Sequence, residues 1–92
     1  MAVNHVTGKN KGKVMLYALS TCGWCAKTKA LLNELGVEYY YVDVDLLKGE
    51  EQSATIEEIK EFNPACSFPT LVIDSQKCIV GFKEDEIRKA LK

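Results

Sequence analysis

Two strand-like segments joined by one helix-like segment place the strongest constraint on the fold of this chain. Residues 13–19 contain the apolar run Val-Met-Leu-Tyr-Ala-Leu, which predicts a buried strand. Residues 26–35 have the apolar spacing of an amphipathic helix, with Lys29 on its outer face and Gly36 at the position of a left-handed C-cap. Residues 37–45 are β-branched and aromatic, as is typical of a second strand. Because a helical connection joins parallel strands with a right-handed crossover, the sequence predicts a βαβ unit.

The second half of the chain predicts a helix, a β-hairpin and a closing helix. We expect the first helix to begin near Ser53, where Thr55 and Glu58 fit a capping box. Residues 70–81 contain two strand-like runs around a short turn, which indicates a hairpin. Residues 83–92 carry acidic side chains early and basic ones late, an order that complements the dipole of a helix.

The resulting element order is β-α-β-α-β-β-α, an α/β fold with a four-stranded mixed sheet. Its 92 residues, 47% of them hydrophobic, are enough for one modest core. We therefore expect a single domain over residues 13–92, preceded by a flexible arm over residues 1–12. The arm is predicted to hold a short ordered piece near residues 3–6 and a solvated His5.

Charge and hydropathy exclude several classes of function. The formal net charge of -1 favours neither nucleic acid nor a membrane surface as a partner. No apolar stretch is long enough to span a bilayer, and the first dozen residues lack the apolar core of a signal peptide. We therefore expect a cytoplasmic protein, in a compartment where paired cysteines are catalytic or metal-bound more often than structural.

The segment Cys22-Gly23-Trp24-Cys25 lies where the first strand turns into the first helix. At a helix N-terminus, unpaired backbone N–H groups and the helix dipole favour the thiolate, which is the nucleophile in disulfide exchange. Cys25 follows about one helical turn later, within reach of a bond to Cys22. The spacing predicts that Cys22 attacks a partner disulfide and that Cys25 resolves the mixed disulfide.

The same two cysteines fit a second hypothesis, an iron–sulfur or zinc binding module. Zinc needs four ligands, and His5, Cys66 and Cys78 offer no second closely spaced pair. The metal hypothesis therefore requires a ligand from a second chain or from glutathione, and we predict no metal ligands within this chain.

The element order, the Cys-x-x-Cys turn and a Phe68-Pro69 step before the third strand together resemble the thioredoxin fold, and within it the glutaredoxin family. The resemblance covers residues 13–92. It implies a dithiol–disulfide oxidoreductase that reduces protein disulfides or glutathione mixed disulfides through Cys22 and Cys25. It also implies a monomer without a tightly bound cofactor.

Further site residues follow from the resemblance. Ser67-Phe68-Pro69-Thr70 is similar to the family's Thr-Val-Pro segment, whose proline is cis and faces the cysteines. In that arrangement the backbone of Phe68 pairs with an extended substrate, as an added strand would. Thr21 and Trp24, beside the cysteines, are predicted to contact the partner, although Trp24 also fits a groove of its own domain.

Gly81-Phe82 stands where glutaredoxins carry Gly-Gly to hold glutathione, and Leu19 stands where many have a basic residue. Both departures weaken a glutathione site. A Gly-Phe step is closer to the glutaredoxin-like redoxins that serve ribonucleotide reductase. The electron donor is therefore either glutathione or a thioredoxin-reductase-type enzyme. Phe82 also fits a plug under the last helix.

The remaining cysteines carry weaker predictions. Cys78 is expected to face the core from the hairpin, opposite Ile73, where a thiol behaves as a small hydrophobe. Cys66, three residues before Pro69, has three open interpretations: glutathionylation, dimerisation or no role.

Overall fold

The computed structural model describes residues 3–91 and confirms the predicted order of elements, with two additions. One is a strand in the N-terminal arm, and the other is a short 3-10 helix after the βαβ unit. The elements are β1 (Asn4–Val6), β2 (Val14–Ala18), α1 (Gly23–Leu35), β3 (Tyr39–Asp43), η1 (Val44–Leu46), α2 (Gly49–Phe62), β4 (Thr70–Ile73), β5 (Lys77–Val80) and α3 (Glu84–Ala90).

The strands form one mixed sheet in the order β1-β3-β2-β4-β5. β2 and β3 are parallel, with Leu16 opposite Tyr41, as the predicted βαβ unit requires. β4 runs antiparallel to β2, and β5 antiparallel to β4. The sheet has five strands, so the prediction of four was wrong by one edge strand.

The additional strand is β1, which pairs antiparallel with β3. Its His5 is exposed, in agreement with the prediction that it is solvated, but it also makes specific contacts. The His5 ring stacks on Tyr40 with 4.5 Å between ring centroids, and its Nε2 lies 2.8 Å from Oε2 of Glu38. Three residues carry little sequence signal for a strand, but the edge of β3 offers unpaired backbone groups that β1 satisfies.

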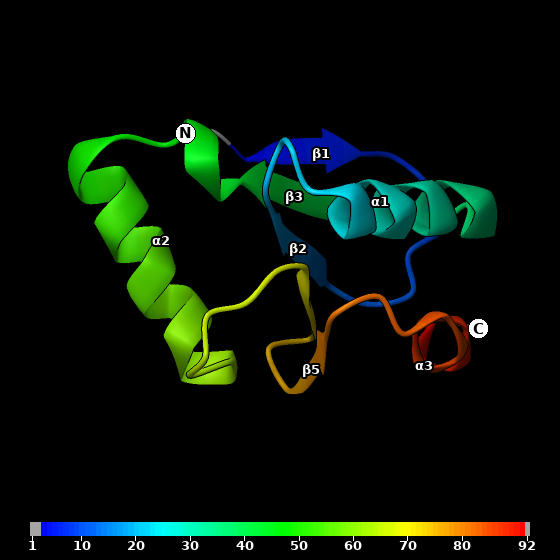
Figure 1. Cartoon of the computed structure of the whole chain (residues 1–92). Coiled ribbons are helices and arrows are strands. Elements are labelled where there is room, and N and C mark those ends of the chain that lie inside the picture. The colour runs from blue at the N-terminus through cyan, green and yellow to red at the C-terminus, as the bar shows by residue number, and fades with distance from the viewer. Residues whose placement is uncertain (1–2, 92) are drawn as a thin grey trace.

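The sheet separates two layers of helices, with α1 and α3 on one face and α2 on the other (Figure 1). The core under α1 and α3 is the larger, and Leu16, Leu32 and Ile87 have no exposed surface there. On the opposite face, α2 packs a fully buried Ile59 near Val72. Since each such side chain contributes about 1.5–3 kcal/mol when buried, both helical layers stabilise the sheet between them. No helix within residues 3–91 has the length and apolar content needed to cross a membrane.

Helix α2 begins at Gly49, about one turn earlier than predicted. The capping box at Thr55 and Glu58 is therefore wrong, because both residues lie inside the helix. Within residues 3–91 no side chain caps this helix start, but Glu50 and Glu51 place negative charge in its first turn, where the dipole favours it. The earlier start shortens the connection from η1.

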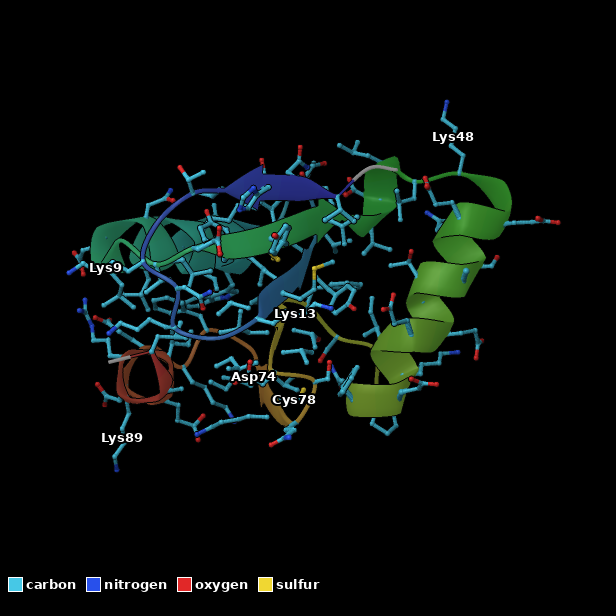
Figure 2. The ribbon with its side chains drawn as sticks, turned by 180° about the vertical axis from the view of Figure 1, so that it is seen from behind. Lys9, Lys13, Lys48, Asp74, Cys78 and Lys89 are labelled. Carbon is cyan, nitrogen blue, oxygen red and sulfur yellow. The ribbon has the colours of Figure 1, made fainter. Side chains whose placement is uncertain are left out.

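The hairpin register differs from its prediction by one residue. Cys78 lies opposite Val72 rather than Ile73. The turn runs from Asp74 to Gln76, because Asp74 already adopts a left-handed backbone with φ 54° instead of continuing the strand. Figure 2 labels Cys78 and Asp74 on this hairpin.

The core-facing residue of β5 is Ile79, which is 3% exposed. Successive strand residues point to opposite faces, so its neighbour Cys78 points away from the core under α1 and α3. Cys78 is half-buried and belongs to neither core, which corrects the prediction that it faces the core. Burial nevertheless raises the pKa of its thiol.

Candidate active site

Cys22 is the N-cap residue of α1. Its backbone is extended (φ -89°, ψ 120°), and its Sγ accepts a hydrogen bond from the backbone N–H of Cys25 at 3.2 Å. A side-chain acceptor at this position satisfies one of the N–H groups that a helix start leaves unpaired. The structure therefore places the Cys22 sulfur at the end of α1 that favours negative charge.

Cys25 lies beneath Cys22 and has no exposed surface, whereas Cys22 is half-buried. This confirms the prediction that Cys22 is the more exposed of the two. Burial raises the pKa of Cys25 to about 12, and a hydrogen bond between its side chain and Cys22 acts in the same direction. The Leu19 N–H, which donates to Cys25 Sγ at 3.5 Å, and the charge of Lys29 act in the opposite direction.

The Phe68-Pro69 segment reaches the cysteines through the register of the sheet. Its peptide bond is cis, as predicted. Thr70 pairs with Tyr17 of β2, so Phe68 and Pro69 lie beside the end of β2, from which the chain runs into Cys22. Phe68 and Cys22 pack against the same core.

A buried polar network supports this segment, and no local pattern in the sequence predicts it. Asn63, 5% exposed, donates through Nδ2 to the Ser67 carbonyl at 3.2 Å, to Ser67 Oγ at 3.1 Å and to Thr70 Oγ1 at 3.0 Å. The Thr70 hydroxyl donates to the Ser67 carbonyl at 2.6 Å. Buried polar groups that are satisfied in this way hold one loop conformation.

Gly81 and Phe82 lie next to the Phe68-Pro69 segment, directly after β5. The Gly81 N–H donates to the Pro69 carbonyl at 2.8 Å, and Gly81 has the positive φ of 83° that favours glycine. Phe82 packs against the core under α1 and α3, and its ring stacks on Trp24 with 5.9 Å between centroids. The packing of Phe82 agrees with the expected plug under α3, and its role as a site residue stays a prediction.

Trp24 forms an aromatic shelf with Phe82 next to Cys22. Its side chain remains 57% exposed in spite of the stack, so it does not fill a groove of its own domain. The ammonium of Lys27 lies 4.7 Å from the centre of the Trp24 ring, a cation–π distance. Exposed aromatic surface of this kind gains free energy when a partner covers it.

The turn before Cys22 is anchored by a second contact that sequence reasoning missed. The Asp45 carboxylate accepts a hydrogen bond from the Ser20 N–H at 2.8 Å and from the Ser20 hydroxyl at 2.5 Å. These bonds hold the pKa of Asp45 below its usual value. Thr21, between Ser20 and Cys22, is exposed beside the nucleophile, as its predicted partner contact requires.

Leu19 is half-buried and packs against the core under α2. An apolar side chain in this position supplies no positive charge to a ligand carboxylate. Leu19 and Phe82 are the two positions at which the sequence departs from the glutathione-binding pattern that the resemblance implies.

The other cysteines lie apart from the Cys22–Cys25 pair. All four cysteines are free thiols, and residues 3–91 contain no group of three or more histidine, cysteine or acidic side chains placed to hold a metal ion. Cys66 is half-buried in the loop after α2, packed against the core on that side of the sheet, and Cys78 lies on β5.

Comparisons with known proteins agree with this geometry. A family model described as Glutaredoxin matches residues 14–78, a range that includes Cys22, Cys25 and the cis-proline segment. The crystal structure of a glutaredoxin from Methanosarcina mazei Go1 is 55% identical, with a TM-score of 0.91 over 99% of this chain and 88% of that one. The methanoredoxin of Methanosarcina acetivorans is also 55% identical, with a TM-score of 0.89 over 91% of this chain and 88% of that one.

Curated sequences add two relatives of different length. A glutaredoxin-like 8.6 kDa protein in a rubredoxin operon of Clostridium pasteurianum is 31% identical over 85% of this chain and 96% of its own length. A probable maleylacetoacetate isomerase of Caenorhabditis elegans is 39% identical over 70% of this chain, but the chain spans only 28% of its length. The fold is thioredoxin-like, and this chain belongs to the glutaredoxin family, whose members are thiol–disulfide oxidoreductases.

Proposed function

We propose that this protein reduces disulfides in other proteins by a two-step dithiol exchange, with Cys22 as the nucleophile and Cys25 as the resolving thiol. The observation that carries the proposal is the contact between the two residues at the start of α1. A half-buried sulfur accepts the N–H of Cys25 at 3.2 Å, and a fully buried thiol lies directly beneath it. One sulfur is thus open to a partner and the other is shielded from it.

The exchange balances with the two thiols alone. The Cys22 thiolate attacks one sulfur of the partner disulfide, so a Cys22–partner bond forms and the partner's second sulfur leaves as a thiolate that takes up a proton. Cys25 then loses its proton and attacks Cys22 Sγ. The Cys22–Cys25 disulfide forms, the bond to the partner breaks, and the released thiolate takes up a proton. The partner gains two electrons and the protein loses two.

The partner segment is proposed to lie along Phe68 in an extended conformation. Neither the N–H nor the C=O of Phe68 has a hydrogen-bond partner within residues 3–91, and both precede the first residue of β4. An added strand would satisfy them. Trp24 and Thr21 would contact the partner on the side of α1.

For the electron donor we propose a thioredoxin-reductase-type protein rather than glutathione. Leu19 and Phe82 remove two features with which the family holds glutathione, and the Trp24 shelf is better suited to a protein surface. Such a cycle operates in a reducing compartment, in agreement with the predicted cytoplasmic location.

Two coupled assays test this proposal. Reduction of a small disulfide-bonded protein is followed with NADPH and thioredoxin reductase in one assay, and with NADPH, glutathione and glutathione reductase in the other. We expect turnover in the first and little in the second. Turnover with glutathione alone would overturn the proposed donor. Silence in both assays, with Cys22 and Cys25 shown to be free thiols, would overturn the exchange itself.

A double substitution sharpens the result. Leu19→Lys with Phe82→Gly restores the charge and the space that glutathione needs, so glutathione-dependent turnover should rise several-fold. Cys22→Ser in the same background serves as the inactive control. If the double variant gains no glutathione-dependent activity, the two residues do not explain the choice of donor.

A further inference from the structure

An ion pair on α1 lies close to the cysteines and has no role in the exchange described above. Lys29 Nζ lies 2.9 Å from Asp43 Oδ1, and the two side chains are only 24% and 15% exposed. The same ammonium lies 4.3 Å from the centre of the Tyr41 ring. The sequence predicted Lys29 on the outer face of the helix, so its inward position is a product of the tertiary structure.

The pair and the buried thiol meet at one end of the sheet. Lys29 follows Cys25 by four residues on α1, so the two side chains lie on the same side of the helix, one turn apart. Asp43 ends β3 opposite Ala18, the residue before Leu19, whose N–H donates to Cys25 Sγ. Lys29 is therefore paired with Asp43 on the side of α1 that also carries the resolving sulfur.

The resolving step requires a negative charge on a sulfur that the core surrounds. Burial opposes that charge, and burial is the main reason for the raised pKa of Cys25. Within residues 3–91, the charged or titratable groups that act on it are Cys22 at the N-cap and Lys29 on its own helix. In the mixed disulfide Cys22 carries no charge, so the cation of Lys29 is then the main charged group that favours the Cys25 thiolate.

We propose that Lys29 stabilises the Cys25 thiolate during resolution of the mixed disulfide, and that Asp43 limits this effect by pairing with the same ammonium. The proposal rests on the exchange proposed above. Lys29 acts through Cys25 and transfers no proton, so it is a positioning residue rather than a catalytic one. The proton of Cys25 goes to solvent, and the released partner thiolate takes one up.

The two members of the pair are expected to act in opposite directions. Removal of the cation by Lys29→Met takes away the positive charge that favours the Cys25 thiolate. Removal of the carboxylate by Asp43→Asn leaves an unpaired cation, which favours it. A purely structural ion pair would give the same direction for both variants, since each loses the same contact.

The test measures the resolving step alone. In a Cys66→Ser, Cys78→Ser background, reduced protein is mixed with dithiobis(nitrobenzoate). The first thionitrobenzoate released reports attack by Cys22, and the second reports resolution by Cys25. Stopped-flow rates of the second release are recorded from neutral to alkaline pH. A shift of one pKa unit changes the thiolate fraction about tenfold, but nucleophilicity offsets part of this, so roughly threefold per unit is expected.

Lys29→Met should slow the second release at neutral pH by roughly threefold or more and move its pH profile upward, while Asp43→Asn should speed it and move the profile downward. Lys29→Arg keeps the positive charge, so its rate of second release should have the same pH dependence as the protein with native Lys29. It remains a usable test if the Lys29→Met variant folds poorly. Lys60→Met and Glu57→Gln, which remove an exposed ion pair of α2, are the matched controls and should change nothing. Equal shifts for both members of the Lys29–Asp43 pair, or an unmoved profile, would overturn the inference.

Failure of the inference is distinct from failure of the proposed exchange. If the first release is normal and the second is insensitive to the pair, Lys29 has no role although the exchange operates. If no second release occurs in the parental protein, Cys25 does not resolve, and the proposed function fails with the inference.

Discussion

The four cysteines of this chain have the same side chain but different surroundings. The strand-to-helix turn that carries Cys22 and Cys25 differs from the region that carries Cys66 and Cys78, and this difference in position sets their expected reactivity. In the turn, two cysteines are linked by a hydrogen bond, one half-buried at a helix N-cap and one fully buried. In the other region, Cys66 lies in a loop after α2 and Cys78 on an edge strand, and both are half-buried without such a partner among residues 3–91. Among residues 3–91, only this turn places a thiol next to both the free backbone N–H groups of a helix start and a second thiol, the two features that disulfide exchange needs.

The largest effect should come from Cys22→Ser. A hydroxyl at this position does not form the attacking thiolate, so turnover with a protein disulfide should fall at least about a hundredfold. The coupled assay with thioredoxin reductase measures it. Cys22→Ser with normal turnover would mean that another cysteine is the nucleophile, and the contrast between the two regions would be lost.

Cys25→Ser should have the next largest effect, on the second step only. The first attack remains possible, but without a resolving thiol the mixed disulfide accumulates. Mass spectrometry of protein quenched with acid should show Cys22 bound to the partner, and turnover should fall about tenfold or more. Absence of the trapped species would show that resolution does not depend on Cys25.

A third prediction concerns Asn63, which connects the region of Cys66 to the substrate segment. Asn63→Ala leaves the Ser67 and Thr70 acceptors without their shared donor, so the free energy of unfolding should fall by about 1–3 kcal/mol. Urea denaturation measures the change. Asn33→Ala, which removes a less buried bond to Tyr39, is the control and should cost less.

If the Asn63→Ala variant folds, it should raise KM for a protein disulfide more than it lowers kcat. The lost hydrogen bonds position the segment that contains Phe68 and do not contact the cysteines. Equal losses in both parameters would assign Asn63 a general structural role.

The pH dependence of stability should distinguish the fully buried thiol of Cys25 from the three half-buried thiols. Its pKa is raised to about 12 from an ordinary value of 9.0, so between these values the unfolded state binds fewer protons than the folded state. Stability from this group is complete below pH 9.0 and falls as pH rises toward 12, by up to about 1.4 kcal/mol per pH unit for one proton. The urea midpoints of the wild type and of Cys25→Ala, compared over this pH range, isolate the contribution of Cys25 to the pH dependence of stability. The raised pKa of Tyr17 contributes equally to both proteins and cancels in the comparison.

The smallest effect is expected for Cys66→Ser and Cys78→Ser. Neither residue lies at the α1 N-cap, so each variant should retain turnover within about twofold of wild type in the coupled assay. A larger loss for Cys66→Ser would give this loop cysteine a part in the cycle and weaken the contrast between the two regions.

Much of the fold followed from local patterns. The apolar run of β2, the amphipathic spacing of α1 and the β-branched run of β3 specified the βαβ unit, because each pattern lies within one element. The Cys22-Gly23-Trp24-Cys25 spacing and the Phe68-Pro69 step likewise identified the segments that the structure brings to one edge of the sheet. The errors were local as well: an added edge strand, an earlier start of α2 and a hairpin register displaced by one residue.

Contacts between distant residues decided the rest. The bonds from Ser20 to Asp45 join positions 25 apart in the chain, and the pairing of Lys29 with Asp43 joins α1 to the end of β3. Neither pair has a spacing that marks it in the sequence. Their partners meet only because parallel β2 and β3 end at the same edge of the sheet. The chain's local patterns thus specified the elements and the reactive thiols, whereas the charges and hydrogen bonds around those thiols depend on the packing of the elements.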